Sequence, residues 1–479
     1  MAFSLGKGLI AVVVFAYGLF TVVLYGALAI KSGTFFRRRT EKETLELHLA
    51  RDRMWNLTKK YSGLSHHFIT LTNGLKIHYM SNTAPGSPAA QDPEKPLVIL
   101  IHGWPDSWAI WRYIAGSADL QGAANLVVLD MPGFGGSGRL DKYSATRVLE
   151  SMTELIILLR LKYGVDDESK SNKKRTVIAA HDWGCVVAMR LAAEAPALAD
   201  RWILSNAPLP KLARANIVRL WISARKMFTT ALNSPLSSRT PMLQAFRTIG
   251  PILRQALLSG YIFAMQLPFP FVRFFLTGGN SSLLAGAHRK SFGQYKPTIE
   301  ERSDAMSTTM GPSLAESKSR NESGENYPTE IDYNHEFPKI LDMASYYRQG
   351  AAAATWHKSL ETITSLHSIA GENELRRTSS GAGIFDEGLP GAFKAPVTVI
   401  WGQNDLALDR RICLDGIADY MVKNSQVIML PHSGHWTPIE KESRAAMEAA
   451  IQWALGGEKG NVETAVQAAY PEATVAVRR

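Results

Sequence analysis

The segment that most constrains the fold is residues 176–185, Thr-Val-Ile-Ala-Ala-His-Asp-Trp-Gly-Cys. Its apolar, β-branched start is typical of a buried parallel strand, and an apolar helical pattern follows it. Ala180 and Gly184 flank Asp182, which permits a tight strand-to-helix turn that exposes the central side chain. An exposed carboxylate there suits attack on an electrophilic sp³ carbon and later hydrolysis of the alkyl ester. The alternative is an Asp that only ends a strand of another doubly wound fold.

Two later strands end in residues that would complete a catalytic set. The strand within residues 395–405 ends at Asp405, and the strand starting at residue 426 leads into a loop that carries His435. We expect Asp405 to fix the tautomer of His435 and to stabilise its charged form, so that His435 activates water.

Other titratable residues compete for these roles. His432 lies on the same loop but ahead of its glycine, and Asp409 lies further from a strand end than Asp405. The preceding core strand offers only Asn206, which favours Asp405 as the acid. His181 is expected to face away from Asp182 as a packed, hydrogen-bonded side chain. His102, which follows an apolar strand at residues 97–101, is expected to orient its loop rather than carry a proton.

Five motifs together resemble the epoxide hydrolases of the α/β-hydrolase superfamily: His102-Gly-Trp-Pro105, Asp130-Met-Pro-Gly-Phe-Gly-Gly-Ser137, His181-Asp-Trp-Gly184, Gly402-Gln-Asn-Asp405 and Gly434-His-Trp436. They span roughly residues 65–455, and their common order is far more specific than any one motif. The resemblance implies an α/β-hydrolase fold with a mostly parallel eight-stranded sheet, helices on both faces and an inserted helical lid. It also implies an oxyanion hole made by the backbone N–H groups of Trp104 and Trp183.

The same resemblance points to two lid tyrosines that hydrogen-bond an epoxide oxygen. Tyr261 stands five residues before Gln-x-Pro, and Tyr347 stands immediately before Arg348, which selects it over Tyr346. A phenol can stabilise the charge that develops on the oxygen without a metal. The alternative is a pair of ordinary amphipathic lid aromatics.

The composition excludes several other classes of function. Two cysteines, Cys185 and Cys413, cannot build a disulfide framework, and no Cys/His cluster has metal-ligand spacing. No phosphate-binding loop or nucleic-acid module is visible, although the net charge is +10. We therefore expect neither a metal nor another cofactor, and no nucleic-acid partner.

Residues 8–30 contain no charged side chain and, as a helix of about 34 Å, are long enough to cross a bilayer. An uncleaved anchor is favoured over a signal peptide, because the apolar stretch is long and its N-terminal flank carries only Lys7. Arg37, Arg38 and Arg39 follow the span and predict a cytosolic catalytic domain on a single-pass membrane protein, with the endoplasmic reticulum as the expected membrane. The span lies outside the predicted catalytic domain, so we expect activity to survive its removal.

The pattern along the chain predicts five parts. An anchor with its basic flank (1–40) precedes the first part of the hydrolase core (41–208). A helical lid (209–348), the second part of the core (349–457) and a loose tail (458–479) follow. Two polar stretches, Ser303 to Tyr327 in the lid and Gly371 to Gly388, are predicted to be loops, the first of them mobile.

These observations lead to one preferred function and two rivals. The preferred function is hydrolysis of apolar epoxides to vicinal diols, with Trp108 and Trp436 beside the substrate and water as the second reactant. A haloalkane dehalogenase would use the same Asp and His but would need halide donors rather than paired phenols. A non-catalytic α/β-hydrolase-fold binding protein would have no need of Asp182, Asp405 and His435 together.

Overall fold

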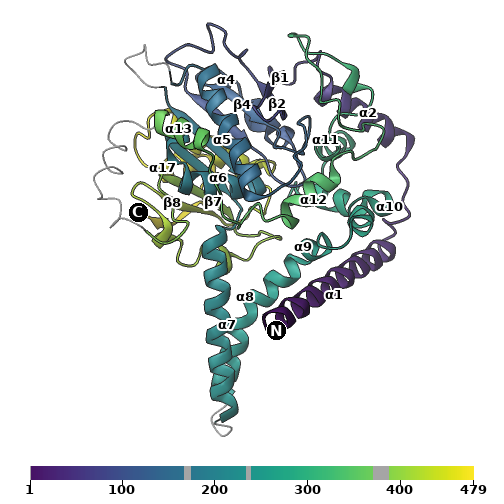
Figure 1. Ribbon diagram of the computed structural model, residues 1–479, viewed down its shortest axis with the longest axis vertical. Helices are drawn as coiled ribbons and strands as arrows, with labels where there is room; N and C mark the ends of the chain where they lie inside the picture. Colours follow the sequence, from purple (N-terminus) through teal and green to yellow (C-terminus); the bar gives the residue numbers. More distant parts are fainter. Residues whose placement is uncertain (1, 167–173, 234–238, 370–387) are drawn as a thin grey trace.

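The computed structural model describes residues 2–166, 174–233, 239–369 and 388–479. A twisted sheet forms its centre, with helices on both faces and a group of lid helices at one end of the strands (Figure 1). In spatial order the strands are β1 (Ser65–Thr70), β2 (Lys76–Ser81), β4 (Asn125–Leu129), β3 (Leu97–Ile101), β5 (Thr176–His181), β6 (Arg201–Ser205), β7 (Val397–Gly402), β8 (Gln426–Leu430) and β9 (Thr474–Arg478).

The run from β4 to β8 is parallel, whereas β1, β2 and β9 pair antiparallel at the edges. The predicted α/β-hydrolase fold is therefore confirmed, but the strand count is nine rather than eight. The additional strand is β9, which pairs with β8.

The prediction that residues 458–479 form a loose tail is also wrong, because this segment contributes a helix and the additional strand. Residues 462–469 form α17 (Val462–Ala469), and β9 closes the sheet edge. Val475 and Val477 alternate with exposed residues along β9, so this strand buries one face only. That alternation was the signal of a half-buried edge strand.

Strand side chains alternate between two apolar layers because successive residues point to opposite faces of a sheet. One layer joins Ile99, Ile101 and Ile178 to α5 (Ala145–Lys162) and α6 (Asp182–Glu194). The other joins the intervening strand residues to a second group of elements, namely η1 (Trp108–Trp111), α3 (Arg112–Ala115), α16 (Lys441–Leu455) and α17. The remaining core helices are α4 (Ala118–Ala123), α13 (Leu360–Ile369) and α15 (Arg410–Leu414). The predicted loop at Gly371 to Gly388 lies almost wholly outside the described residues.

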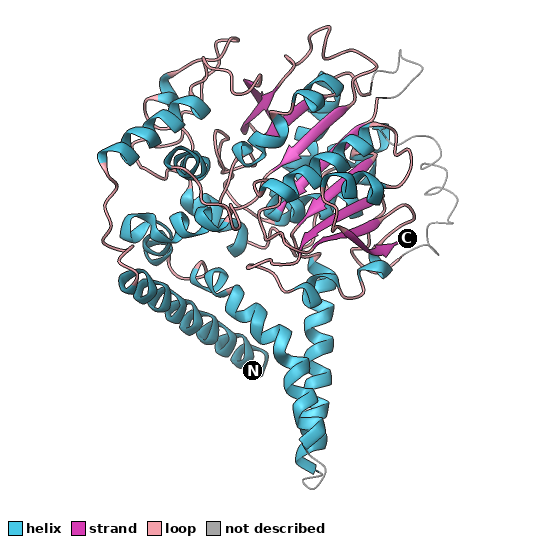
Figure 2. Cartoon of the chain, turned by 180° about the vertical axis from the view of Figure 1, so that it is seen from behind, coloured by secondary structure: helices cyan, strands magenta, loops and turns pink. Residues whose placement is uncertain are grey.

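Six lid helices lie between β6 and β7 among the described residues: α7 (Pro210–Asn233), α8 (Arg239–Leu258), α9 (Gly260–Ala264), α10 (Phe269–Lys290), α11 (Ile299–Met310) and α12 (Ile340–Arg348). Helices α7 and α8 pair and project away from the rest of the molecule (Figure 2). Helix α10 is interrupted by non-helical residues at 278–281.

The mobile loop predicted for Ser303 to Tyr327 is also wrong in its first part. Helix α11 includes residues 303–310, and all eight are buried against neighbours that include α2 (Glu41–Trp55). Its polar side chains are satisfied inside the protein: the Thr308 hydroxyl donates to Asp106 at 2.9 Å, and the Trp55 indole donates to the Ser307 carbonyl at 3.1 Å. A polar composition suggested exposure here, but buried hydrogen bonds replace the contacts with water.

One helix, α1 (Ala2–Lys31), includes the apolar stretch and is long and apolar enough to cross a membrane between Gly8 and Lys31. It runs along the lid beside α9 and α10 (Figure 1). Val22 belongs to the core cluster, and the Tyr17 hydroxyl donates to the Ala256 carbonyl at 2.9 Å. The span was predicted to lie outside the catalytic domain, but it packs against the lid.

Candidate active site

The predicted nucleophile stands at the sharp turn between β5 and α6. Asp182 has φ +50°, a left-handed backbone conformation that is costly for a non-glycine residue and that aims its side chain out of the turn. The turn leaves no room for larger neighbours. A Cβ on Gly103 would lie 2.4 Å from Asp182 Oδ1, and a Cβ on Gly184 would lie 2.2 Å from the His102 carbonyl oxygen.

The two carboxylate oxygens of Asp182 have different partners. The Trp104 backbone N–H donates to Oδ1 at 2.7 Å, while Oδ2 lies 3.4 Å from His435 Nε2. Burial opposes ionisation of this carboxyl, but the hydrogen bond and charge of His435 outweigh it and lower the pKa of Asp182. Asp182 is therefore an anion at neutral pH, as a carboxylate nucleophile must be.

Asp405, the predicted acid, contacts the ring nitrogen of His435 that points away from Asp182. His435 Nδ1 lies 2.9 Å from Asp405 Oδ2, which also accepts a hydrogen bond from the Asn206 amide at 2.7 Å. The other oxygen of Asp405 accepts the backbone N–H groups of Ala407 and Leu408. Burial alone would lower the pKa of His435, yet the charge of Asp405 and the hydrogen bond to Asp182 raise it to about 10.

The competing residues lie elsewhere. His432 is exposed and forms an ion pair with Glu472, and Asp409 caps α15 and pairs with Arg254 at 2.9 Å. His181 is buried, and its Nε2 lies 2.8 Å from the His435 carbonyl oxygen, so it supports the histidine loop. His102 Nε2 accepts the backbone N–H of Met131 at 2.9 Å, which agrees with its predicted structural role.

Both predicted lid tyrosines lie against the tryptophans of the predicted oxyanion hole. The Tyr261 ring stacks on Trp104 with centroids 5.8 Å apart, and Tyr347 meets Trp183 edge-on at 4.9 Å. The two phenol rings are 5.8 Å from each other. Burial is the main cause that raises the pKa of each phenol, and the charge of Asp182 adds to it. Both phenols therefore keep their protons at neutral pH and can donate hydrogen bonds.

The residues that marked these tyrosines in the sequence tie their two segments together. The Gln266 amide donates to the Tyr347 carbonyl at 2.9 Å, and the Arg348 guanidinium donates to the Leu267 carbonyl at 2.5 Å. Tyr346 is fully buried instead, and its hydroxyl donates to the Pro132 carbonyl at 2.9 Å. Of the two adjacent tyrosines, Tyr347 is therefore the one near Asp182.

The two other tryptophans that were predicted beside the substrate lie in different parts of the structure. Trp436 lies beside His435 with ring centroids 5.1 Å apart. Trp108 is fully buried in the opposite apolar layer and packs edge-on against Trp55 and Tyr61, so the structure does not bring it to the site. It follows the tight loop after β3 into η1, where its side chain enters the core between sheet and helix.

Sequence reasoning missed three polar residues around the site. Asn206 was considered only as a missing acid, although it holds Asp405; its position at the end of β6 was the available signal. Glu440 accepts the Gly434 backbone N–H at 2.8 Å and so braces the histidine loop. Burial raises the pKa of Asp106 to about 7, and the charge of Asp182 adds to this effect. Among the described residues, no group of three or more His, Cys, Asp or Glu side chains is arranged to hold a metal ion.

Comparison with protein families gives a result consistent with this geometry. The model of the alpha/beta hydrolase family matches residues 98–450. The chain belongs to this family. The matched range includes the candidate catalytic residues of both halves of the sheet together with the lid between them.

Within the alpha/beta hydrolase family, the chain is similar to epoxide hydrolases. It is 30% identical to epoxide hydrolase 3 of Xenopus tropicalis over 141 residues, which is 29% of this chain and 32% of that protein. It is 26% identical to epoxide hydrolase 1 of Caenorhabditis elegans over 211 residues, 43% of each chain. The chain thus matches less than half the length of these relatives. A crystal structure of a Bacillus megaterium epoxide hydrolase with an inhibitor aligns with a TM-score of 0.46 and 16% identity, over 82% of this chain and 100% of that one.

Proposed function

We propose that this chain hydrolyses apolar epoxides to vicinal diols through an ester on Asp182. The observation that carries the proposal is the combination of a carboxylate at the turn with two protonated phenols beside it. Asp182 Oδ2 attacks an epoxide carbon, the carbon–oxygen bond of the ring breaks, and Tyr261 or Tyr347 protonates the released oxygen. Oδ1, which accepts the Trp104 N–H, becomes the carbonyl oxygen of the ester.

Water then cleaves the ester. His435 takes a proton from water as the water oxygen attacks the ester carbonyl carbon, and the N–H groups of Trp104 and Trp183 stabilise the oxyanion. Collapse of this intermediate breaks the bond to the substrate oxygen, which takes the second proton of the attacking water, so the diol is freed and the Asp182 carboxylate is restored. His435 keeps the first proton and is charged again, so one epoxide and one water give one diol.

The resting charge state suits this order of steps. While Asp182 is ionised, it helps to hold the proton on His435. Esterification removes that negative charge and lowers the pKa of His435, so its proton passes to the phenolate left by ring opening and the neutral imidazole becomes available as a base. The base thus becomes available when the ester needs it.

Trapping the ester tests this mechanism. His435→Gln should still be alkylated by an epoxide but should fail to release diol, so intact-protein mass spectrometry should show one added substrate mass, and peptide mapping should locate it on Asp182. Asp182→Asn is the control and should show no adduct. If ¹⁸O-water enters the diol in a single turnover without labelling Asp182, water attacked the epoxide directly and the proposal is wrong.

We further propose that α1 anchors the protein in a membrane, with the endoplasmic reticulum and a cytosolic catalytic domain as the expected placement. Its apolar length and the arginines that follow it support this. A lipid-borne substrate would suit the aromatic surroundings of Asp182. Resistance of the full chain to carbonate extraction from cell membranes tests the anchoring, and glycosylation of Asn56, Asn280 or Asn321 would contradict the cytosolic side.

A further inference from the structure

The paired helices α7 and α8 carry an unusual surface. Nine of their large apolar side chains are exposed: Ile217, Val218, Trp221, Ile222, Leu232, Leu243, Phe246, Leu253 and Leu257. Isolated exposed apolar residues are common on soluble proteins, but a set of this size on one projecting element indicates an interaction surface. On the core helix α5, by contrast, Leu161 is the one exposed large apolar residue.

The arrangement on α8 is amphipathic. Leu243, Phe246, Leu253 and Leu257 recur at spacings of three, seven and four residues and so lie along one stripe of the helix. Ala245, which is fully buried, lies off this stripe. Phe246 also meets Phe228 of α7 edge-on with ring centroids 5.2 Å apart, so the stripe borders the partner helix while all four of its side chains stay more than half exposed.

The charges on the pair have one sign. Helices α7 and α8 together contain eight Lys or Arg residues and no Asp or Glu. Two of the arginines, Arg219 and Arg254, face acids at the base of the pair, Asp415 and Asp409. A helix surface that combines exposed Trp, Phe and Leu with basic side chains is typical of binding at an anionic lipid surface.

The pair is also continuous with α1. The Tyr17 hydroxyl of α1 donates to the Ala256 carbonyl of α8, next to the exposed Leu257. On the outer side of α1, Ile10, Val12 and Val13 are more than half exposed. An apolar medium that covers α1 near Tyr17 would therefore lie next to Leu257, at the C-terminal end of the stripe on α8.

We propose that the α7–α8 pair enters the interface of an anionic phospholipid bilayer beside α1. The lid would then be held to the membrane at two elements rather than one. This inference extends the anchoring proposed for α1 and is independent of the epoxide chemistry.

Site-specific fluorescence tests the proposal on the full chain. Phe246→Cys and Leu253→Cys each receive an environment-sensitive fluorophore, with Leu161→Cys on α5 as a control of similar exposure. Val12→Cys reports α1, and the native Cys185 and Cys413 are both buried and should stay unlabelled. The labelled proteins are reconstituted in phosphatidylcholine vesicles with 30% phosphatidylserine, with or without brominated acyl chains (about a third anionic lipid, enough to set a negative surface potential).

Strong quenching by brominated lipid at positions 246 and 253, with none at position 161, is the expected result. Quenching at position 12 alone would show that α1 is inserted and that the pair is not, which overturns this inference but leaves the anchor. Disulfide formation between copies through position 246 or 253, without quenching, would assign the surface to a second copy of the chain and would also overturn it.

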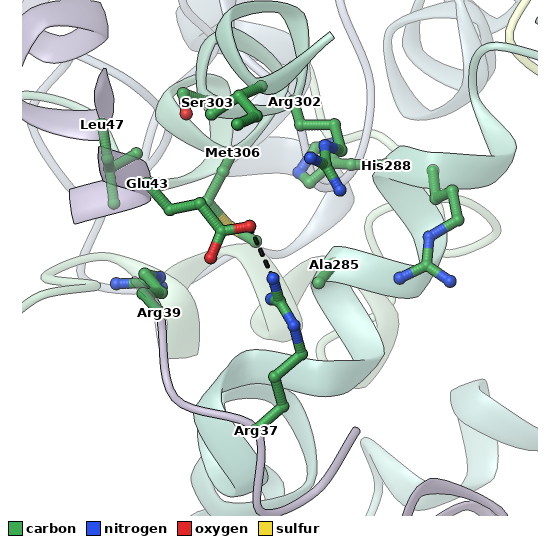
Figure 3. Close-up of a pocket in the computed structure, with 11 residues that line it drawn as sticks. Arg37, Arg39, Glu43, Leu47, Ala285, His288, Arg302, Ser303 and Met306 are labelled. Carbon is green, nitrogen blue, oxygen red and sulfur yellow. Dashed lines mark hydrogen bonds and ion pairs between the residues drawn. The ribbon is translucent and has the colours of Figure 1, made fainter. Parts of the chain in front are cut away.

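A separate observation concerns a cavity of about 100 Å³ where the chain leaves α1 (Figure 3). Four arginines line it: Arg37 and Arg39 after α1, Arg289 at the end of α10 and Arg302 on α11. The one acidic residue of its lining is Glu43.

The four guanidinium groups are unequally neutralised. Arg37 pairs with Glu43 at 2.5 Å, and Arg39 pairs with Glu336. Arg302 makes one long hydrogen bond, to the Thr298 carbonyl at 3.4 Å, and Arg289 has no partner within the described part of the chain. Burial lowers the pKa of His288 to about 3, so this residue adds no charge. Neither Arg289 nor Arg302 forms a salt bridge within the described residues, although Arg302 interacts electrostatically with Glu43, which is already paired with Arg37.

We infer that this cavity binds a phosphate group, whose oxygens match the paired N–H donors of guanidinium groups. The two sources with this chemistry are the headgroup of an anionic lipid and a free phosphate. Arg37 lies six residues past the end of α1, which suits contact with a headgroup at the membrane surface.

Thermal unfolding of the full chain in neutral detergent micelles distinguishes the sources. Dioctanoyl phosphatidic acid should raise Tm of the parent chain and should leave Tm of Arg289→Gln/Arg302→Gln unchanged. Arg38→Gln, an exposed neighbour outside the lining, should keep the full shift. An equal shift with inorganic phosphate would assign the site to free phosphate rather than lipid. No shift with either probe, or the same shift in the double variant, would overturn the inference.

Discussion

The two sides of the candidate site are held in different ways. On the sheet side, Asp182, Asp405 and His435 follow β5, β7 and β8, and backbone N–H groups or neighbouring polar side chains hold each of them. On the lid side, Tyr261 and Tyr347 come from α9 and α12, which are joined through Gln266 and Arg348, and α1 packs against α9. The sheet-side residues are thus fixed by the ends of neighbouring strands in one sheet, whereas the lid-side residues depend on packing between separate helices.

The largest expected change in rate, which tests the sheet side, comes from replacing Asp405. Asp405→Asn removes the charge that holds the proton on His435 and loosens the imidazole, so ester hydrolysis should slow by up to about 10⁴-fold. Alkylation of Asp182 should change far less, because it needs no base. Rapid-quench single-turnover measurements separate the two steps, and an equal loss in both would mean that Asp405 mainly supports folding.

On the lid side, Tyr261→Phe and Tyr347→Phe should each remove a hydrogen bond to developing charge. Such a bond is worth roughly 2–4 kcal/mol, or about 30- to 1000-fold in the rate of alkylation, and the double variant should be nearly inactive. Tyr346→Phe is the matched control, since its hydroxyl bonds to Pro132 away from Asp182. Full turnover by the double variant would remove both phenols from the mechanism.

The contrast between the two sides also explains what the sequence could predict. The apolar runs of β3 and β5 and the small residues around Asp182 are local patterns, so the fold and the triad order could be inferred from them. The place of Trp108 could not, because only the full tertiary contacts decide which layer a side chain enters.

Packing between distant segments misled the sequence prediction for α11 of the lid and for α1. The polar residues of α11 looked exposed because their partners, such as Trp55 and Asp106, lie about 200 or more positions away. The contacts of α1 with α9 had no sequence signal beyond apolarity, which lipid and protein satisfy equally. Both cases are tertiary contacts that a local pattern cannot encode.

The pH dependence should differ between the two steps, by about tenfold per pH unit where it is steepest. In the free enzyme the charge of Asp405 and the hydrogen bond to Asp182 raise the pKa of His435 to about 10 against the effect of burial. The ester removes the Asp182 charge, so His435 deprotonates at lower pH in the intermediate, and hydrolysis should rise as pH increases through that lower value. Alkylation uses an Asp182 whose pKa is lowered, so it should stay flat near neutrality. Single-turnover rates across the pH range check this, and a steep rise in alkylation near neutral pH would contradict it.

The smallest effect is expected where α1 supports the lid. A Cβ on Gly18 would lie 2.5 Å from the Phe263 carbonyl oxygen, so Gly18→Leu must push α1 away from α9, the short helix that carries Tyr261. A small misplacement of a group that positions the substrate is costly, and about a tenfold loss in kcat/KM is expected.

Gly26→Leu is the matched control: it lies on the same helix with nothing within 4 Å of its added Cβ, and it makes the same change in apolarity. Both variants should stay in the membrane fraction, so a difference between them reports packing and not anchoring. Adding Tyr261→Phe to Gly18→Leu should cost less than it does in the parent chain, because the phenol is already displaced. Equal activity of Gly18→Leu and Gly26→Leu would show that the lid side stands without α1, and the distinction between the two sides of the site would then lie in α9 and α12 alone.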